Sequence, residues 1–230
     1  MPVLELLTSS GLGSLLGMRH ALEPDHLAAV STLVTGERTS FKAAFLGICW
    51  GLGHTFALLA VGTVLVVLRA EMPARIADGF EFCVALMLIG LGVRAIDLAV
   101  RQGPAGPSHV HQHGHTMHVH EGAPAHIHIG TWTLARRPLL VGAVHGLAGS
   151  GALTALVVAT LPSTSARITY MVVFGLGSTL GMAALSGLLG WPLARAGSNQ
   201  RLARGLSLAV GCVSTVLGLV WGYPLIGRLF

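Results

Sequence analysis

Five ionisable side chains lie close together near the start of the chain, in the stretch RHALEPDH at residues 19–26. Imidazole and carboxylate groups at this spacing can bind a metal ion or transfer protons. The flanking sequence is apolar on both sides, so these groups fall in the middle of a segment long enough to cross a bilayer. Each charged side chain near the bilayer centre costs about 2.5 to 3.5 kcal/mol on an insertion scale, which indicates a functional site.

Pro24 predicts an interruption in this segment. It has no N–H to donate to the carbonyl of His20, and its ring displaces that carbonyl. In a regular helix His20, Asp25 and His26 would point in different directions, whereas a broken helix can turn all three toward one point and leave backbone groups free beside them. Broken backbone at membrane depth is tolerated where it lines a cavity. An ion pair between Arg19 and Glu23 is an alternative explanation for those two residues alone.

Imidazole nitrogen combined with carboxylate oxygen suits zinc, nickel, cobalt or ferrous iron and is a poor donor set for sodium or potassium. The residues therefore predict a transition-metal site at His20, Asp25 and His26. His54, in the stretch WGLGHT at 50–55, is a fourth candidate ligand. A packed, hydrogen-bonded histidine is the alternative interpretation of His54.

The composition predicts an all-α integral membrane protein. Of the 230 residues, 53% are hydrophobic and 10% are charged, and the mean hydropathy is +0.72. Apolar runs of suitable length predict six transmembrane helices, at residues 6–34, 43–68, 80–100, 138–161, 168–190 and 205–226. The first run has no basic leader and carries buried charges, so we do not expect a cleaved signal peptide.

The sequence also matches itself. GMRHALEPDHLAAV at 17–30 aligns with GAVHGLAGSGALTA at 142–155, and WGLGHTFAL at 50–58 aligns with FGLGSTLGM at 174–182. We therefore expect two halves of three helices, at 1–100 and 138–230, joined by a loop at 101–137. Because three is odd, the halves have opposite polarity, and such 3+3 inverted repeats place interrupted helices at a midplane substrate site. The first and fourth helices are the expected interrupted pair.

The alignment assigns different roles to the two halves. His145 aligns with His20, while Ser150 and Gly151 stand where the first half has Asp25 and His26. The first half is thus expected to bind the ion, and the second half to shape its path. The further candidates for the metal site or path are Glu23, Thr55, His145, Ser150, Ser178 and Thr179.

The loop between the halves contains eight of the twelve histidines: His109, His111, His113, His115, His118, His120, His126 and His128. Its prolines and glycines predict a mobile segment without a core. Histidine-rich tracts are typical of metal binding, although an incidental polar linker is an alternative.

Basic residues near the helix ends predict the orientation. Eight lie in the connections after the first, third and fifth helices, and four lie on the opposite side. We expect both termini outside the cytoplasm and the histidine-rich loop inside, in a bacterial inner membrane. The pI of about 9.9 reflects this bias, so it indicates no nucleic-acid partner.

The stretch GMRHALEPDHL resembles the R-H-A-x-D-A-D-H signature of the nickel/cobalt transporter (NiCoT) family, particularly its short six-helix urease-accessory and high-affinity nickel permease members. The resemblance carries His20, Asp25 and His26 onto the H-x-x-x-x-D-H metal motif and Glu23 onto its first aspartate. His54 with Thr55 matches a G-H-S/T element in the next helix. Pro24 departs from the pattern, since alanine is common there, and segments 138–161 and 168–190 lack the acidic residues of longer members.

The resemblance implies uptake of Ni²⁺ or Co²⁺ as a transported substrate, with no cofactor, and cytoplasmic metallochaperones as candidate partners. Efflux remains an alternative direction. Two other classes stay open from the residues: a membrane-embedded enzyme with a His-Asp pair, and a metal-binding accessory protein or sensor that does not transport.

Overall fold

The computed structural model describes residues 3–34, 39–68, 70, 72–101, 108–113, 116–121, 126–129, 132–148, 161, 163–196 and 200–230. Four helices are long and apolar enough to cross a membrane: α3 (Ser40–Leu68), α4 (Ala74–Arg101), α7 (Thr164–Ala196) and α8 (Gln200–Leu229). They contain the predicted spans at 43–68, 80–100, 168–190 and 205–226. These four predictions of long helices are confirmed.

The first predicted span consists of two helices, α1 (Val3–His20) and α2 (Pro24–Val34), so the predicted interruption is present. The His20 carbonyl accepts a hydrogen bond from the Glu23 N–H at 3.0 Å, and the Glu23 carbonyl accepts one from Leu27 at 2.9 Å. Pro24 thus takes the first helical position of α2, where its missing N–H costs nothing. The expectation of a free carbonyl at His20 is wrong, because the tight turn supplies another donor.

Two elements are too short to cross a bilayer. The 11 residues of α2 extend about 16 Å at 1.5 Å per residue, roughly half of the hydrocarbon thickness. The fourth predicted span begins with α5 (Arg136–Ala148), which has 13 residues. The expected interruption of that span and Ser150 lie outside the described residues.

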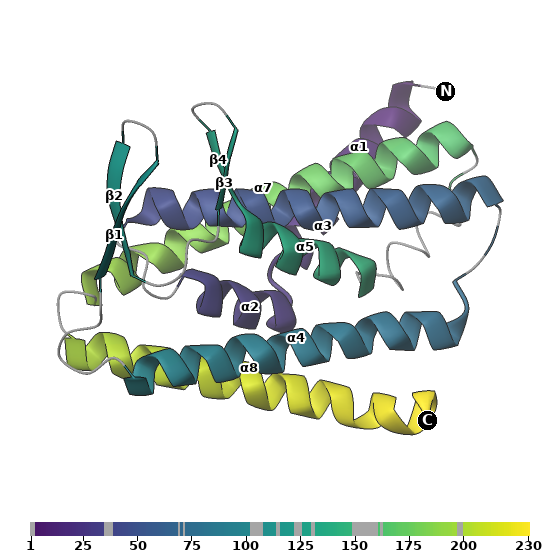
Figure 1. The fold of residues 1–230 in the computed structure, drawn as a ribbon. Coiled ribbons are helices and arrows are strands. Elements are labelled where there is room, and N and C mark those ends of the chain that lie inside the picture. The colour runs from purple at the N-terminus through teal and green to yellow at the C-terminus, as the bar shows by residue number, and fades with distance from the viewer. Residues whose placement is uncertain are drawn as a thin grey trace.

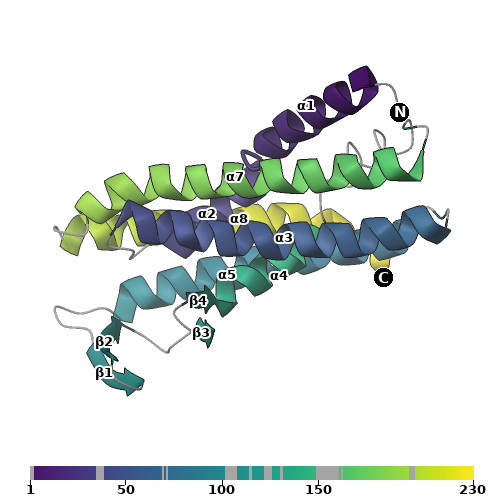
Figure 2. The ribbon, with the colours of Figure 1, turned by 90° about the horizontal axis from the view of Figure 1, so that it is seen from above.

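The long helices pack as two pairs, α3 with α7 and α4 with α8, and the short helix α2 lies between the pairs (Figure 1). α2 contacts all four long helices. α1 runs along α7 and α5 runs along α3, as the view from above also shows (Figure 2). The beginning of α1 and the end of α8 lie at the same end of the bundle.

Glycines permit unusually close approaches between these helices. At eight of the glycines, which are named in the next sentences, a Cβ atom would overlap the main chain or a side chain of the partner helix, so a larger residue would push the helices apart. Each contact has a counterpart in which both residues are shifted by 124 to 126 positions. The contact of Gly17 with Phe174 corresponds to that of Gly142 with Trp50, the contact of Gly53 with Leu139 to that of Gly177 with Ser14, and the contact of Gly51 with Thr179 to that of Gly175 with Thr55. Between α4 and α8, the contacts of Gly92 with Gly211 and Thr215 correspond to those of Gly218 with Ala85 and Ile89.

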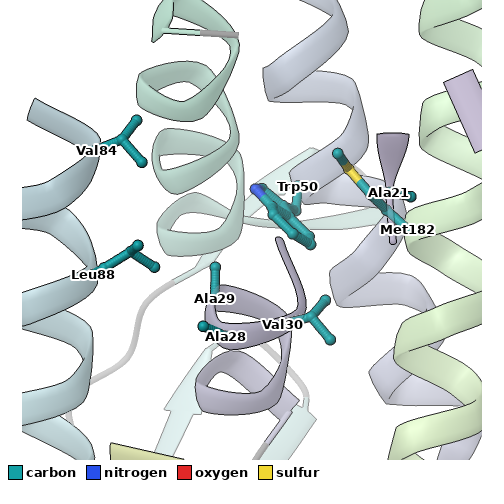
Figure 3. Packing of buried hydrophobic residues seen from close by; sticks show 8 residues of the cluster. All are labelled: Ala21, Ala28, Ala29, Val30, Trp50, Val84, Leu88 and Met182. Atoms are coloured by element: carbon teal, nitrogen blue, oxygen red, sulfur yellow. The ribbon is translucent and has the colours of Figure 1, made fainter. Parts of the chain in front are cut away.

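A buried apolar cluster surrounds α2. Its members come from the 21–30 segment, α3, α4 and α7: Ala21, Ala28, Ala29, Val30, Trp50, Val84, Leu88 and Met182 (Figure 3). Small residues on α2 let the neighbouring helices approach, while the Trp50 ring is fully buried among them. Large apolar side chains on the outside, including Phe56 and Leu188, are exposed, as expected of helices that face lipid.

Part of the histidine-rich loop forms two antiparallel hairpins, a departure from the all-α expectation. They pair β1 (Ser108–His113) with β2 (Thr116–Glu121) and β3 (His126–Ile129) with β4 (Trp132–Ala135). The alternation of histidine with other residues has the period of a strand, which explains the pairing. The register sets His109 opposite His120 and His111 opposite His118, positions that share one face of the hairpin.

Candidate metal site

Four histidines and one aspartate converge inside the bundle. His20 ends α1, Asp25 and His26 begin α2, His54 lies in α3 and His145 lies in α5. All five residues are buried, and His26 and His54 are completely inaccessible. The break at Pro24 makes this possible, because it places His20 and His26 with their ring centroids 4.3 Å apart.

Asp25 connects two of the histidines. Its Oδ2 lies 2.8 Å from His145 Nε2 and its Oδ1 lies 3.1 Å from His26 Nδ1. The His26 backbone N–H also donates to Oδ1 at 2.9 Å. A carboxylate that accepts from ring N–H groups fixes the orientation of both imidazoles.

Other ring nitrogens in the cluster are buried without a hydrogen-bond partner among the described residues. They are Nε2 of His20, Nε2 of His26, both nitrogens of His54 and Nδ1 of His145. Glu23 Oε2 lies 3.0 Å from His20 Nδ1, but the two groups are not aligned as a hydrogen bond. An unsatisfied buried polar group costs about 1 to 3 kcal/mol, so a cation that accepts these lone pairs would be stabilising here.

Two overlapping sets of three residues have donor atoms close enough to hold one ion. His20, His26 and His54 form the first set, and Asp25, His26 and His145 form the second; within each set the donor atoms lie within 4.8 Å of one another. The structure therefore does not bring Asp25 into one set with His20 and His54. His26 belongs to both sets.

Aromatic rings line the cluster. Phe174 lies beside His20, with ring centroids 5.5 Å apart. Trp50 lies beside both His26 and His145, at 5.4 and 5.8 Å. Apolar rings exclude water, so an ion here would exchange its hydration shell for protein ligands.

Three helix ends contribute partial charges at the cluster: the carboxyl ends of α1 and α5, and the amino end of α2, whose partial positive charge lies beside the Asp25 carboxylate. His20 is the last residue of α1, and His145 lies in the last turn of α5. The carboxyl ends of helices carry partial negative charge, which favours a cation. Two such ends reach the cluster from different parts of the chain.

The other residues predicted from the sequence have varied positions. The Thr55 hydroxyl donates to the Gly175 carbonyl at 2.9 Å and lies 3.0 Å from the Thr179 hydroxyl, so both threonines join α3 to α7. Ser178 is buried, and its hydroxyl has no partner within the described ranges. Glu23 is partly exposed beside His20 rather than paired with Arg19.

The sequence predicts His145 only as a further candidate for the metal site or path, whereas the structure places it in direct contact with Asp25. Substitution of Asp25 and His26 by Ser150 and Gly151 in the second half suggested a mainly structural role for its surroundings. The alignment of His145 with His20 in the internal repeat is the sequence signal that favours His145 as a metal ligand. Its contact with Asp25 joins residues 120 positions apart.

Long apolar helices around a buried polar cluster define a multi-pass helical membrane protein. The chain belongs to the high-affinity nickel-transport protein family (NicO), whose model matches residues 6–217. The predicted family resemblance is confirmed. This is a family of metal-ion transporters and not of enzymes, so the alternative of a membrane-embedded enzyme is set aside.

The chain is also similar to individual bacterial and plant proteins. The chain is 31% identical to the urease accessory protein UreH of Bacillus sp. (strain TB-90), over 98% of this chain and 95% of the relative. It is 29% and 28% identical to the chloroplast proteins FOR GROWTH AND FERTILITY 2 and 1 of Arabidopsis thaliana, over 81% and 80% of this chain. It spans 48% and 50% of those two longer proteins. No solved structure matches the chain.

Proposed function

We propose that this protein takes up Ni²⁺, with Co²⁺ as an alternative substrate, through a midplane ligand cluster that contains His20, Asp25, His26 and His54. The observation that carries the proposal is the group of buried imidazole nitrogens without partners, next to a buried carboxylate. Uncharged imidazole is a good ligand for both ions. The family assignment supports metal-ion transport.

The ion exchanges bound water for these side chains and must later leave them. Structural zinc sites gain about 10 to 16 kcal/mol from binding, and a transport site has to be much weaker. The split between α1 and α2 supports this role, because ligands on two separate helices can move apart without unfolding either helix.

The proposed architecture is a 3+3 inverted repeat of residues 1–100 and 138–230, joined by 101–137. The recurring glycine contacts support it, since α1 meets α7 as α5 meets α3, at a nearly constant offset. Two equivalent halves that meet at the metal cluster can rock about it and expose it to each side in turn.

The histidine-rich loop is proposed to face the cytoplasm of a bacterial inner membrane, with both termini outside. Its β1–β2 hairpin lies toward the end of the bundle opposite the start of α1 and the end of α8. There the loop would collect arriving Ni²⁺ and pass it to cytoplasmic metallochaperones. Deleting 108–128 is expected to change the apparent affinity but leave transport in place; a folded deletion variant without any uptake would refute this role.

Uptake of radiolabelled Ni²⁺ and Co²⁺ into proteoliposomes tests the main proposal. His20→Ala and Asp25→Ala should each abolish most uptake. Tyr170→Phe is a matched control, because it removes a buried hydroxyl that has no partner within the described residues and belongs to neither ligand set. Unchanged uptake in both ligand variants would reject the site, and net outward movement would reject uptake in favour of export.

A further inference from the structure

We propose that the cluster contains two metal stations that share His26 and are filled alternately. The first station is His20, His26 and His54, and the second is Asp25, His26 and His145. This inference rests on the proposed function. It adds that the ion moves from one station to the other during transport. It assigns His145 a direct ligand role in the second station.

His26 occupies the middle of the cluster. Its ring centroid lies 4.3 Å from that of His20 and 4.1 Å from that of His145. The two ring nitrogens have different surroundings, since Nδ1 contacts Asp25 and Nε2 has no partner among the described residues. A single imidazole in this position can serve an ion on either side.

The two stations have matching surroundings. His20 lies against Phe174, and His145 lies against Trp50. His20 and His145 align in the internal repeat, 125 positions apart, and Trp50 and Phe174 align 124 positions apart. Each terminal histidine therefore packs beside an aromatic ring from the other half, so the exchange of halves that relates the glycine contacts also relates these two histidines and their aromatic neighbours.

The stations differ in their hydrogen bonding. Donor nitrogens of the first station are unpartnered, whereas Asp25 joins the second station through contacts of 2.8 Å to His145 and 3.1 Å to His26. The first station is ready to receive an ion. An ion entering the second must replace the bonds to Asp25, so the hydrogen bonds keep that station closed until the ion arrives.

One shared ligand makes the two occupancies exclusive. A neutral imidazole has a free lone pair on only one ring nitrogen at a time, so His26 can complete only one of the two three-ligand sets. The protein should therefore bind one ion at a time. Ni²⁺ binding should require only one intact station, whereas Ni²⁺ transport should require both.

The test compares Ni²⁺ binding with Ni²⁺ uptake in full-length variants. His54→Ala damages the first station only, His145→Ala the second only, and His26→Ala both. We expect the first two to bind one Ni²⁺ per chain by calorimetry, with Kd within about tenfold of wild type, while uptake falls about 100-fold. His26→Ala should lose both binding and uptake.

X-ray absorption of bound Ni²⁺ provides a second readout. In His145→Ala the ion should have the three imidazoles of the first station, and in His54→Ala two imidazoles and a carboxylate. His145→Asn is added as a smaller change, and melting temperature and elution profile identify any variant that fails to fold. Tyr170→Phe is again the control.

Each outcome decides between the proposals. Normal uptake by His145→Ala, with His20→Ala inactive, would overturn the second station and leave the proposed transport site intact. Loss of all Ni²⁺ binding in folded His54→Ala and His145→Asn would show one indivisible site instead of two. Normal uptake by His26→Ala would reject the proposed function itself.

Discussion

The two long helix pairs are joined in the same way but differ in their chemical content. In α3–α7, Gly51 meets Thr179, and in α4–α8, Gly92 meets Gly211 and Thr215. Each pair also has a side-chain hydroxyl that donates to a carbonyl on the partner helix: Thr55 to Gly175, and Ser214 to Leu88. Only the first pair includes a histidine of the cluster, since α4 and α8 contain no histidine.

This difference separates packing from ligand binding. Close glycine contacts and hydroxyl hydrogen bonds are enough to hold long helices together in lipid, so they indicate helix–helix interfaces and do not by themselves indicate a metal-binding site. In the α3–α7 pair, α3 also contributes His54 to the metal cluster. The α4–α8 pair contributes no cluster residue and packs against α2. Substitutions in the two pairs should thus have similar effects on the free energy of unfolding and different effects on Ni²⁺ binding and uptake.

The largest expected effect separates the pairs directly. His54→Ala, in α3, should lower Ni²⁺ uptake about 100-fold because it removes a proposed ligand. Ser214→Ala, in α8, removes a buried hydroxyl that bonds the Leu88 carbonyl and should leave uptake within about twofold of wild type. Initial uptake rates in proteoliposomes of equal protein content measure both. Equal losses in the two variants would contradict the distinction.

Glycine substitutions give the next effect. A Cβ at Gly51 would lie 2.6 Å from Thr179 Cα, and one at Gly92 would lie 2.6 Å from the Gly211 carbonyl oxygen. Gly51→Val and Gly92→Val should each lower the free energy of unfolding by about 1 to 3 kcal/mol through overpacking. Thermal melts in detergent test this.

Calorimetry on the same two samples sharpens the result. Only Gly51→Val should weaken Ni²⁺ binding, because His54 lies less than one turn further along α3. Equal weakening in Gly92→Val would mean that the α4–α8 pair also affects the positions of the metal ligands.

A smaller effect concerns the hydroxyl link between α3 and α7. Thr55→Val should cost about 0.6 kcal/mol, typical of hydrogen bonds between transmembrane helices. A double-mutant cycle with Thr179→Val measures the coupling, since the two hydroxyls lie 3.0 Å apart. Strict additivity would show that this contact contributes nothing to the pair.

The smallest effect is expected at the ion pair that joins the beginning of α4 to the end of α8. Arg228 lies 3.2 Å from Asp78, and its side chain is 59% exposed. Arg228→Gln should cost less than about 1 kcal/mol and should matter less at high salt. Melting temperatures at low and high salt check this, with Arg101→Gln, at the other end of α4, for comparison.

The sequence could predict features that depend on local chemistry. Pro24 located the break because a missing N–H disrupts a helix wherever it occurs, and apolar runs located the four long helices. Imidazole and carboxylate groups in an apolar segment indicated the polar centre, and His20, His26 and His54 do lie together there.

The remaining features depend on packing between distant segments. Asp25 meets His145 because α5 lies along α3, a contact that no local pattern encodes. The turn at 21–23 supplies the His20 carbonyl with a donor, which depends on how tightly the chain bends there. The hairpins differ from the expected mobile loop because the alternation of histidine with other residues favours paired strands, a preference that composition alone does not reveal.

The placement of α2 has a consequence for how the protein is made. This helix is only 11 residues long, yet it contacts α3, α4, α7 and α8, and the last of these ends at Leu229. During synthesis the surroundings of α2 are therefore incomplete until α8 has left the ribosome. The last of these helices to be made therefore completes the packing around α2, although all five residues of the metal cluster precede it in the chain.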